Sequence, residues 1–301
     1  MAEFTLRGII PPVPTIFTEH NRFDAAGQAR LLDHLIAAKV DGVLILGSGG
    51  EFCHMPAAMR LEVAEFCIRH VAGRVPVMIG IGAPGTLDTI AYGRHAQKAG
   101  ADAALVINPY YAHLSERNLF LHYEQVAHAV DLPLMIYNFP NLSGQDVGPD
   151  MALALTRRCE NIIGIKDTVE QIAHTRRLIQ EVKSVRPEFL VFAGFDEQVL
   201  NALILGGDGG IPATVNFAPQ LGCGLFAAFT RGDYAAAFEK HRAIAGLAPI
   251  YDIETPFFAV IKEAIRRTGL DISPAVLPPG RPLTAEATDK VVQVLHANGL
   301  V

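Results

Sequence analysis

Short apolar runs rich in β-branched residues alternate along the chain with segments of helical periodicity. Runs such as VLILG, PVMIG, ALVIN, LPLMIY, NIIGIK and FLVFAG recur about every 30 residues, and the segments between them (24–38 and 56–71 are clear examples) place apolar side chains on one helical stripe. Strand, helix, strand at this spacing is a βαβ unit, which requires a parallel sheet. The predicted strands end at Phe17, Gly47, Gly80, Asn108, Tyr137, Lys166, Gly194 and Ala213.

Eight such strands within about 215 residues predict the α/β class and a closed (β/α)₈ TIM barrel, which we place at residues 1–230. The nearly continuous apolar character of the strands fits a sheet covered on both faces. A doubly wound open sheet is the structural alternative, and the absence of a GxGxxG motif after the first strand weakens it.

The chain after the eighth predicted strand has no further strand pattern. Helices are expected at residues 226–229, 233–248, 256–268 and 284–297, and the stretch VLPPGRP is expected to be a rigid connector. We therefore predict a C-terminal helical appendage over residues 231–301.

Composition narrows the possible partners and the cellular location. The chain has 301 residues, a 19% charged fraction and a formal net charge of −6, so neither nucleic acid nor an anionic membrane is an expected partner. The N-terminus MAEFTLRGIIPP lacks the pattern of a signal peptide, and no apolar run approaches the roughly 18 residues of a membrane span. We expect a soluble, cytoplasmic protein.

The metal-binding residue types are dispersed. The four cysteines form no CxxC pair, and the eleven histidines show no HExxH or similar ligand spacing. We expect reduced thiols and no metal site.

One lysine stands out by its position. Active sites of barrel enzymes lie at the C-terminal ends of the strands, and only Lys166, in NIIGIKDT, ends an apolar strand. Partial burial favours the neutral amine, which is the nucleophilic form. The plainer alternative is that Lys166 only pairs with Asp167 or binds an anion. The other lysines fall in helical segments that we expect to be compatible with solvent: Lys39, Lys98, Lys183, Lys240, Lys262 and Lys290.

Two neighbouring motifs favour the catalytic interpretation. Tyr137, in MIYNFP, ends the preceding strand, so its phenol is expected beside Lys166, where it can transfer protons. Ser48, in ILGSGGEF, lies on a glycine-flanked turn whose backbone N–H groups suit a small carboxylate such as that of pyruvate. The alternative for GSGGE is a tight turn with Glu51 near a helix start.

Taken together and in this order, GSGGE, NPYY, YNFPNLSG, GIKDT and AGFDE resemble the dihydrodipicolinate synthase/N-acetylneuraminate lyase family, from about residue 8 to about residue 300. The resemblance implies a homotetrameric barrel enzyme, without a cofactor, that forms a pyruvate imine on Lys166. It implies Tyr137 as the proton shuttle and Ser48 as a relay to Tyr111, which the neighbouring subunit offers. It also implies that the backbone at Ser48 and Gly49 holds the pyruvate carboxylate.

Departures from the family pattern indicate the substrate class. Leu142 stands where dihydrodipicolinate synthases have an arginine for the aldehyde's carboxylate, and Gly49 replaces the usual threonine. In GGIPATVN, Pro212 and Ala213 replace the glycine and serine of sialic-acid lyases, which disfavours a nine-carbon sugar. The pattern looks most like bacterial 2-keto-3-deoxygluconate, galactonate or pentonate aldolases. By this resemblance, further substrate contacts are expected from Thr168, Gly194, Asp196, Glu197 and Ile211.

Other functions stay open at this point. A 2-keto-3-deoxy sugar acid dehydratase shares the imine, and 4-hydroxy-tetrahydrodipicolinate synthase or N-acetylneuraminate lyase activity is a further alternative. A phosphate-binding barrel using the glycine-rich residues 206–210 is disfavoured, because Asp208 lies inside that turn and no Lys or Arg adjoins it. A non-catalytic pyruvate sensor should have lost Lys166 or Tyr137, and both are present.

Overall fold

The computed structural model describes residues 6–301 and divides the chain into two compact units. The first unit comprises the described residues up to Gly8 and Pro76–Ile211, and the second comprises Ile9–Val75 and Pro212–Val301. Within the described residues no helix is long and apolar enough to cross a membrane.

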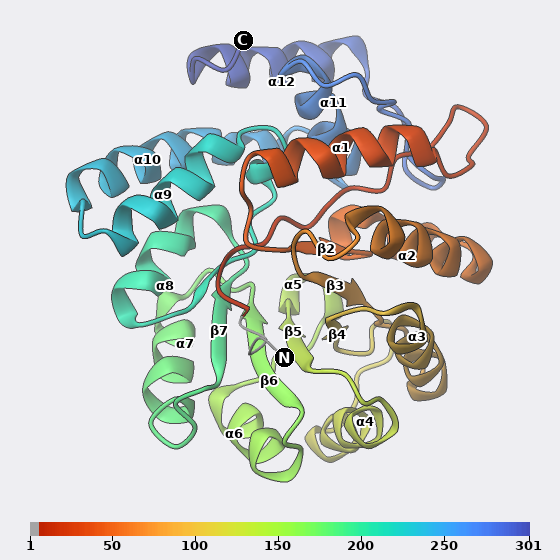
Figure 1. Ribbon diagram of the computed structural model, residues 1–301, viewed down its shortest axis with the longest axis vertical. Helices are drawn as coiled ribbons and strands as arrows, with labels where there is room; N and C mark the ends of the chain where they lie inside the picture. The colour runs from red at the N-terminus through yellow and green to blue at the C-terminus, as the bar shows by residue number, and fades with distance from the viewer. Residues whose placement is uncertain (1–5) are drawn as a thin grey trace. The chain divides into compact units, whose positions relative to one another are not determined.

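The first unit contains a run of parallel strands, each paired with the next along the chain. Helices follow the strands and lie outside them in Figure 1, α3 beside β3 and β4 and α7 beside β7. The strands are β3 (Val77–Gly80), β4 (Ala103–Ile107), β5 (Leu134–Asn138), β6 (Ile162–Asp167), β7 (Leu190–Ala193) and β8 (Gly209–Gly210). The helices are α3 (Thr86–Ala99), α4 (Glu116–Ala129), α5 (Pro140–Ser143), α6 (Pro149–Arg158), α7 (Ile172–Arg177), which continues as the π-helical turn η3 (Leu178–Val182), and α8 (Val199–Leu205), which the 3₁₀ turn η4 (Asp196–Gln198) precedes.

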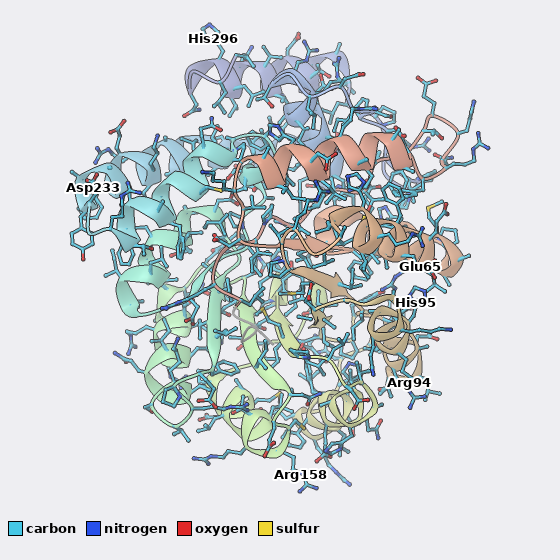
Figure 2. All side chains as sticks on the ribbon, viewed as in Figure 1. Glu65, Arg94, His95, Arg158, Asp233 and His296 are labelled. Atoms are coloured by element: carbon cyan, nitrogen blue, oxygen red, sulfur yellow. The ribbon has the colours of Figure 1, made fainter. Side chains whose placement is uncertain are left out.

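These strands are short and buried on both faces. Every residue of β3, β4 and β5 is buried, as the continuous apolar runs predicted. The polar side chains Arg94 and Arg158, labelled in Figure 2, lie instead on helices α3 and α6, at the periphery of the unit. The predicted alternation of strands and helices is confirmed here.

The predicted end of the last strand was wrong by three residues. β8 ends at Gly210, although the Ile211 N–H still donates to Ala193 O at 2.8 Å. Pro212 has no N–H to continue the ladder, and the chain turns into the 3₁₀ helix η5 (Thr214–Asn216).

The second unit holds the other two strand positions and most of the C-terminal helices. β1 (Gly8–Ile9) begins at the boundary between the units. β2 (Val43–Ile45) lies parallel to the residues that follow β1, and a parallel bridge joins Pro12 to Leu44. The helices are α1 (Ala25–Ala37), α2 (Ala57–Val71), α9 (Pro219–Thr230), α10 (Tyr234–Leu247), α11 (Phe258–Arg267) and α12 (Ala285–Ala297), with 3₁₀ turns η1 (Ser48–Gly50), η2 (Phe52–His54), η5 and η6 (Ala248–Asp252).

The first strand is much shorter than predicted. It ends at Ile9 instead of Phe17, because Pro11, Pro12 and Pro14 remove the backbone donors that a ladder needs. The predicted helices agree with the structure within two residues at their ends, except that α9 begins at Pro219, well before residue 226.

Of the glycine-rich residues 206–210, residues 206–208 form a tightly packed connection before β8, and Gly209 and Gly210 form the strand itself. A Cβ at Gly207 would lie 2.9 Å from Ala202 O, and one at Gly209 would lie 1.9 Å from Gly8 O. The buried Asp208 carboxylate accepts hydrogen bonds from Lys183 Nζ at 2.6 Å and from the Val191 N–H at 2.9 Å. A basic residue, Lys183, therefore does lie beside this loop, although it is not adjacent in the sequence. Its charge is neutralised by Asp208, so it is not available for a phosphate. The loop also precedes its strand, so it lies at the strand's amino end, away from the end where barrels bind phosphate.

Candidate active site

The ends of β5 and β6 bring Tyr137 and Lys166 together. The two residues are register partners on adjacent parallel strands, and their exposed fractions are 3% and 4%. Lys166 Nζ lies 4.1 Å from the centroid of the Tyr137 ring, within the range of a cation–π contact. The predicted pair of amine and phenol therefore exists, side by side and shielded from bulk water.

The alternative in which Asp167 merely neutralises Lys166 is wrong. Successive side chains of a strand point to opposite faces. The Asp167 carboxylate instead accepts hydrogen bonds from Thr175 Oγ1 at 2.7 Å, His174 Nδ1 at 3.0 Å and Asn138 Nδ2 at 3.1 Å. The Asp167 carboxylate is thus engaged by side chains other than Lys166.

Asp167 belongs to a closed polar ring with Asn138, Asp146 and His174, which we call the histidine ring. His174 Nε2 lies 3.3 Å from Asp146 Oδ2, and Asn138 Nδ2 donates to Asp146 Oδ1 at 2.8 Å as well as to Asp167. The ring includes the residues that directly follow Tyr137 and Lys166 in their strands. It therefore connects the ends of β5 and β6 directly beside Tyr137 and Lys166.

The charge on His174 follows from this geometry. Burial alone lowers the pKa of His174, but the contacts with Asp146 and Asp167 outweigh it and raise the pKa to about 10. Burial raises the pKa of Asp146, and its contacts with His174 and Asn138 bring it below its usual value. His174 is therefore an imidazolium at neutral pH. His174 was not among the predicted site residues, because nothing in its spacing from Asp146 along the sequence indicates a contact.

Thr168 and Gly194 form a close-packed step beside the reactive pair. The Thr168 hydroxyl is buried and has no hydrogen-bond partner within residues 6–301, which suits a group that awaits a ligand. A Cβ at Gly194 would lie only 1.9 Å from Thr168 Oγ1, so position 194 must be glycine if Thr168 keeps this place. The close contact thus explains why residue 194 is a glycine, and the unpartnered hydroxyl makes Thr168 a candidate for ligand binding.

The other predicted substrate contacts of this unit lie just beyond β7 and β8. Asp196 is buried at the start of η4, Glu197 is partly exposed and Ile211 is buried. Phe195 packs edge-on against Phe139, which follows β5, with ring centroids 5.9 Å apart. These residues all lie at the carboxyl ends of the strands, the expected side.

Leu142 lies on α5 in the segment that follows β5. It is 52% exposed, and the Ser143 hydroxyl anchors the segment by donating to Phe139 O and Gln145 O, each at 3.0 Å. An apolar side chain held in this exposed place offers no charge to a carboxylate.

Tyr111 is not part of the buried cluster of its own chain. Its side chain is fully exposed, and its backbone has φ +81°, a left-handed conformation that is unusual for tyrosine. A large aromatic side chain held outward is compatible with a contribution to another subunit.

Ser48 and Gly49 belong to the second unit, in a turn of residues 47–51 that we call the carboxylate turn. Gly50 N donates to Gly47 O at 2.9 Å, Glu51 N donates to Ser48 O at 3.0 Å, and Thr15 Oγ1 donates to Gly50 O at 2.8 Å. The first amides of a 3₁₀ turn are not used by the hydrogen bonds of the turn itself, so the amide of Gly49 is suited to bind an anion.

The structure corrects our expectation for Lys262. Its side chain is fully buried and forms an ion pair with the equally buried Glu51. Burial lowers the pKa of Lys262 to about 8, against the opposing effect of Glu51. Helical periodicity concealed this lysine, because α11 is buried on nearly all sides; the only signal was its place inside the apolar run FAVIKEAI.

These features define a class of protein. The model of the dihydrodipicolinate synthetase family matches residues 5–298, and the chain belongs to that family. The family resemblance inferred from the motifs is confirmed.

Individual relatives are more specific. The chain is 50% identical over 276 residues to the putative 2-dehydro-3-deoxy-D-gluconate aldolase YagE of Escherichia coli K12, covering 92% of this chain and 91% of YagE. It is 44% identical to the probable 2-dehydro-3-deoxy-D-pentonate aldolase YjhH of the same strain, covering 98% of each chain.

Solved structures agree with this placement. The crystal structure of E. coli YagE in complex with pyruvate matches with a TM-score of 0.97 at 47% identity, covering 98% of this chain and 99% of YagE. Dihydrodipicolinate synthase from Thermotoga maritima matches with a TM-score of 0.93 at 28% identity, covering 98% of this chain and 99% of that one.

Proposed function

We propose that this protein is a Schiff-base (class I) aldolase that cleaves a 2-keto-3-deoxy sugar acid to pyruvate and a short hydroxyaldehyde. The observation that carries the proposal is the buried contact between Lys166 Nζ and the Tyr137 ring at the ends of β5 and β6. The similarity to YagE and YjhH supports a gluconate-, galactonate- or pentonate-derived substrate.

The same proposal includes the architecture and the assembly. We infer a closed (β/α)₈ barrel with residues 231–301 as a helical appendage, supported by the parallel strands and by the likeness to YagE over 98% of the chain. The outward Tyr111 supports a homotetramer in which a neighbouring subunit receives this side chain. We expect the enzyme in the cytoplasm.

The reaction begins at Lys166. Its neutral amine attacks the 2-keto carbon, and loss of water gives an iminium that can accept an electron pair. Tyr137 takes the proton from the C4 hydroxyl as the C3–C4 bond breaks, and those electrons flow into the iminium to form an enamine. The aldehyde leaves, protonation at C3 follows, and hydrolysis releases pyruvate and restores the lysine. No metal or organic cofactor is required, because the iminium is the electron sink.

Different residues would bind the two ends of the sugar acid, its carboxylate and its hydroxyl-bearing chain. The amides of Ser48 and Gly49 would hold the carboxylate next to the reacting carbon. The hydroxyl of Thr168 and the carboxylates of Asp196 and Glu197 would bind the hydroxyl groups of the sugar chain. Leu142 offers no cation for a second carboxylate, which disfavours the lysine-pathway aldehyde.

Pyruvate release from 2-keto-3-deoxygluconate, coupled to lactate dehydrogenase, tests the proposal. We expect steady release from the wild type, none from Lys166→Ala, and normal release from Lys98→Ala, a lysine on the surface helix α3. Borohydride with pyruvate should add mass to Lys166 in the wild type. Normal turnover by Lys166→Ala would refute the scheme. Adduct formation without pyruvate release, together with loss of water from the sugar acid, would establish the dehydratase instead.

A further inference from the structure

Glu51 has an unusual backbone and an unusual environment for a carboxylate. It ends the carboxylate turn with φ +58°, a left-handed conformation that costs a non-glycine residue about 1 kcal/mol or more. Its side chain is 0% exposed. Both features have a cost in free energy, so other contacts must hold the residue in place.

Those contacts come from the C-terminal part of the same unit. Lys262 Nζ, on α11, donates to Glu51 Oε1, and the Leu277 N–H donates to Glu51 Oε2 at 2.9 Å. Lys262 also donates to Ala275 O at 2.7 Å and lies 4.4 Å from the Phe17 ring centroid. Glu51 and Lys262 thus join the carboxylate turn to segments more than 200 residues away in the sequence.

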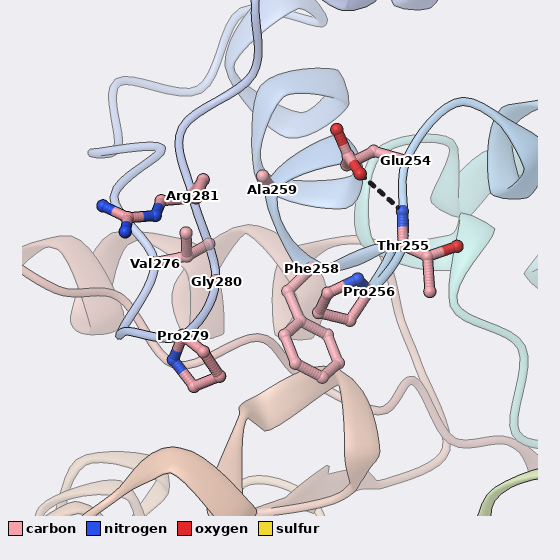
Figure 3. A pocket seen from close by; sticks show the side chains of 9 residues that line it. All are labelled: Glu254, Thr255, Pro256, Phe258, Ala259, Val276, Pro279, Gly280 and Arg281. Atoms are coloured by element: carbon pink, nitrogen blue, oxygen red, sulfur yellow. Dashed lines mark hydrogen bonds between the residues drawn. The ribbon is translucent and has the colours of Figure 1, made fainter.

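A second contact connects the same regions. A Cβ at Gly49 would lie 3.7 Å from Phe257 Cε2, so the Phe257 ring covers this face of the turn. Phe257 packs against the apolar cluster of Phe258, Ala259 and Val276. Figure 3 shows Phe258 and Val276 of this cluster, which come from two segments and line a cavity of about 130 Å³.

Stability alone does not explain a buried ion pair of this kind. Apolar replacements of similar volume are often neutral or stabilising, because two buried charges lose their hydration. A carboxylate beside an anion-binding turn would also repel an incoming anion unless a cation neutralises it. Lys262 neutralises the buried Glu51 carboxylate. The turn can therefore keep Glu51 beside it without repelling an incoming anion.

We propose that the Glu51–Lys262 pair is a positioning device that holds the carboxylate turn, and with it the amide of Gly49, in the conformation that binds the substrate's carboxylate. This rests on the proposed function, since it takes the carboxylate of a 2-keto acid as the ligand of the turn. The C-terminal helix α11 is then part of the binding machinery for the keto-acid end of the substrate. The pair acts through the backbone and does not touch the reacting atoms.

The test compares Lys262→Met with the double variant Glu51→Gln/Lys262→Met. The single variant leaves a buried carboxylate unpaired and should lose thermal stability, whereas the double variant has no unpaired charge and should recover most of it. Lys290→Met is the matched control, because Lys290 forms an exposed ion pair with Glu286 at 2.7 Å.

The informative measurement is the dependence of both borohydride trapping and turnover on keto-acid concentration. We expect KM, and the pyruvate concentration for half-maximal trapping, to rise at least tenfold in the double variant, while kcat changes less than threefold. Trapping of glyceraldehyde, which has no carboxylate, should be unchanged. Lys290→Met should behave as the wild type.

The outcomes separate this inference from the proposed function. If the double variant regains both stability and the wild-type KM, the pair is only structural and the inference is overturned. An equal loss of glyceraldehyde trapping would also overturn it, since the defect would not concern the carboxylate. If the wild type itself neither traps pyruvate nor releases it, the proposed function fails instead.

Discussion

His174 should make the stability of this protein depend on pH in a defined direction. Its folded pKa of about 10 lies above the ordinary value of 6.5, so the folded state binds the proton more tightly than the unfolded chain does. The stabilisation is complete below about pH 6.5, declines as the pH rises, and is lost as the pH passes through about 10. Replacement by glutamine removes the titrating group while keeping a hydrogen-bonding side chain.

The magnitude follows from the size of the pKa difference. At about 1.4 kcal/mol for each tenfold change in proton affinity, the full difference would be about 5 kcal/mol. Solvent reduces this value, because the side chain of Asp146, one of the two carboxylate partners, is 48% exposed. We expect His174→Gln to lower the free energy of unfolding by about 2 kcal/mol at pH 6.

The assay is denaturant unfolding at one protein concentration, repeated from pH 6 to pH 10.5 for the wild type and His174→Gln. The difference between them should shrink steadily above pH 6.5 and nearly vanish by pH 10.5. His128→Gln serves as the control, since His128 is an exposed histidine on α4. A difference that stays constant over this range would refute the argument, because it would show that charge on His174 is not the source of stability.

Three further substitutions test the site more directly. Tyr137→Phe should still give the borohydride adduct with pyruvate but slow cleavage of the sugar acid by at least 100-fold, and unchanged turnover would exclude the phenol as proton carrier. Gly194→Ala should destabilise the protein by about 1–3 kcal/mol and raise KM, because its Cβ would lie 1.9 Å from Thr168 Oγ1, whereas Gly85→Ala meets only an ordinary contact at 3.9 Å and should be tolerated by both measures. Leu142→Arg should raise the rate of pyruvate condensation with an aldehyde that bears a carboxylate relative to glyceraldehyde, and no change in that ratio would remove residue 142 from the aldehyde site.

The sequence by itself determined the order of strands and helices and singled out the lysine that we propose as the nucleophile. Apolar periodicity is a local property, so it survives without tertiary information, and most element ends were predicted within two residues. Lys166 could be found because parallel strands collect their carboxyl ends on one side. Prolines explain why β1 and β8 end earlier than predicted, since an apolar run with proline cannot complete a ladder.

Only the tertiary structure decided which polar groups are buried together. Helical periodicity placed Lys262 among the solvent-compatible lysines, yet its partner Glu51, more than 200 residues away, holds it as a buried cation. His174 becomes an imidazolium because two carboxylates, Asp167 at the end of β6 and Asp146 in the loop before α6, converge on it. Charge states and ion pairs depend on distances and on access to water, and these are set only when remote segments pack against one another.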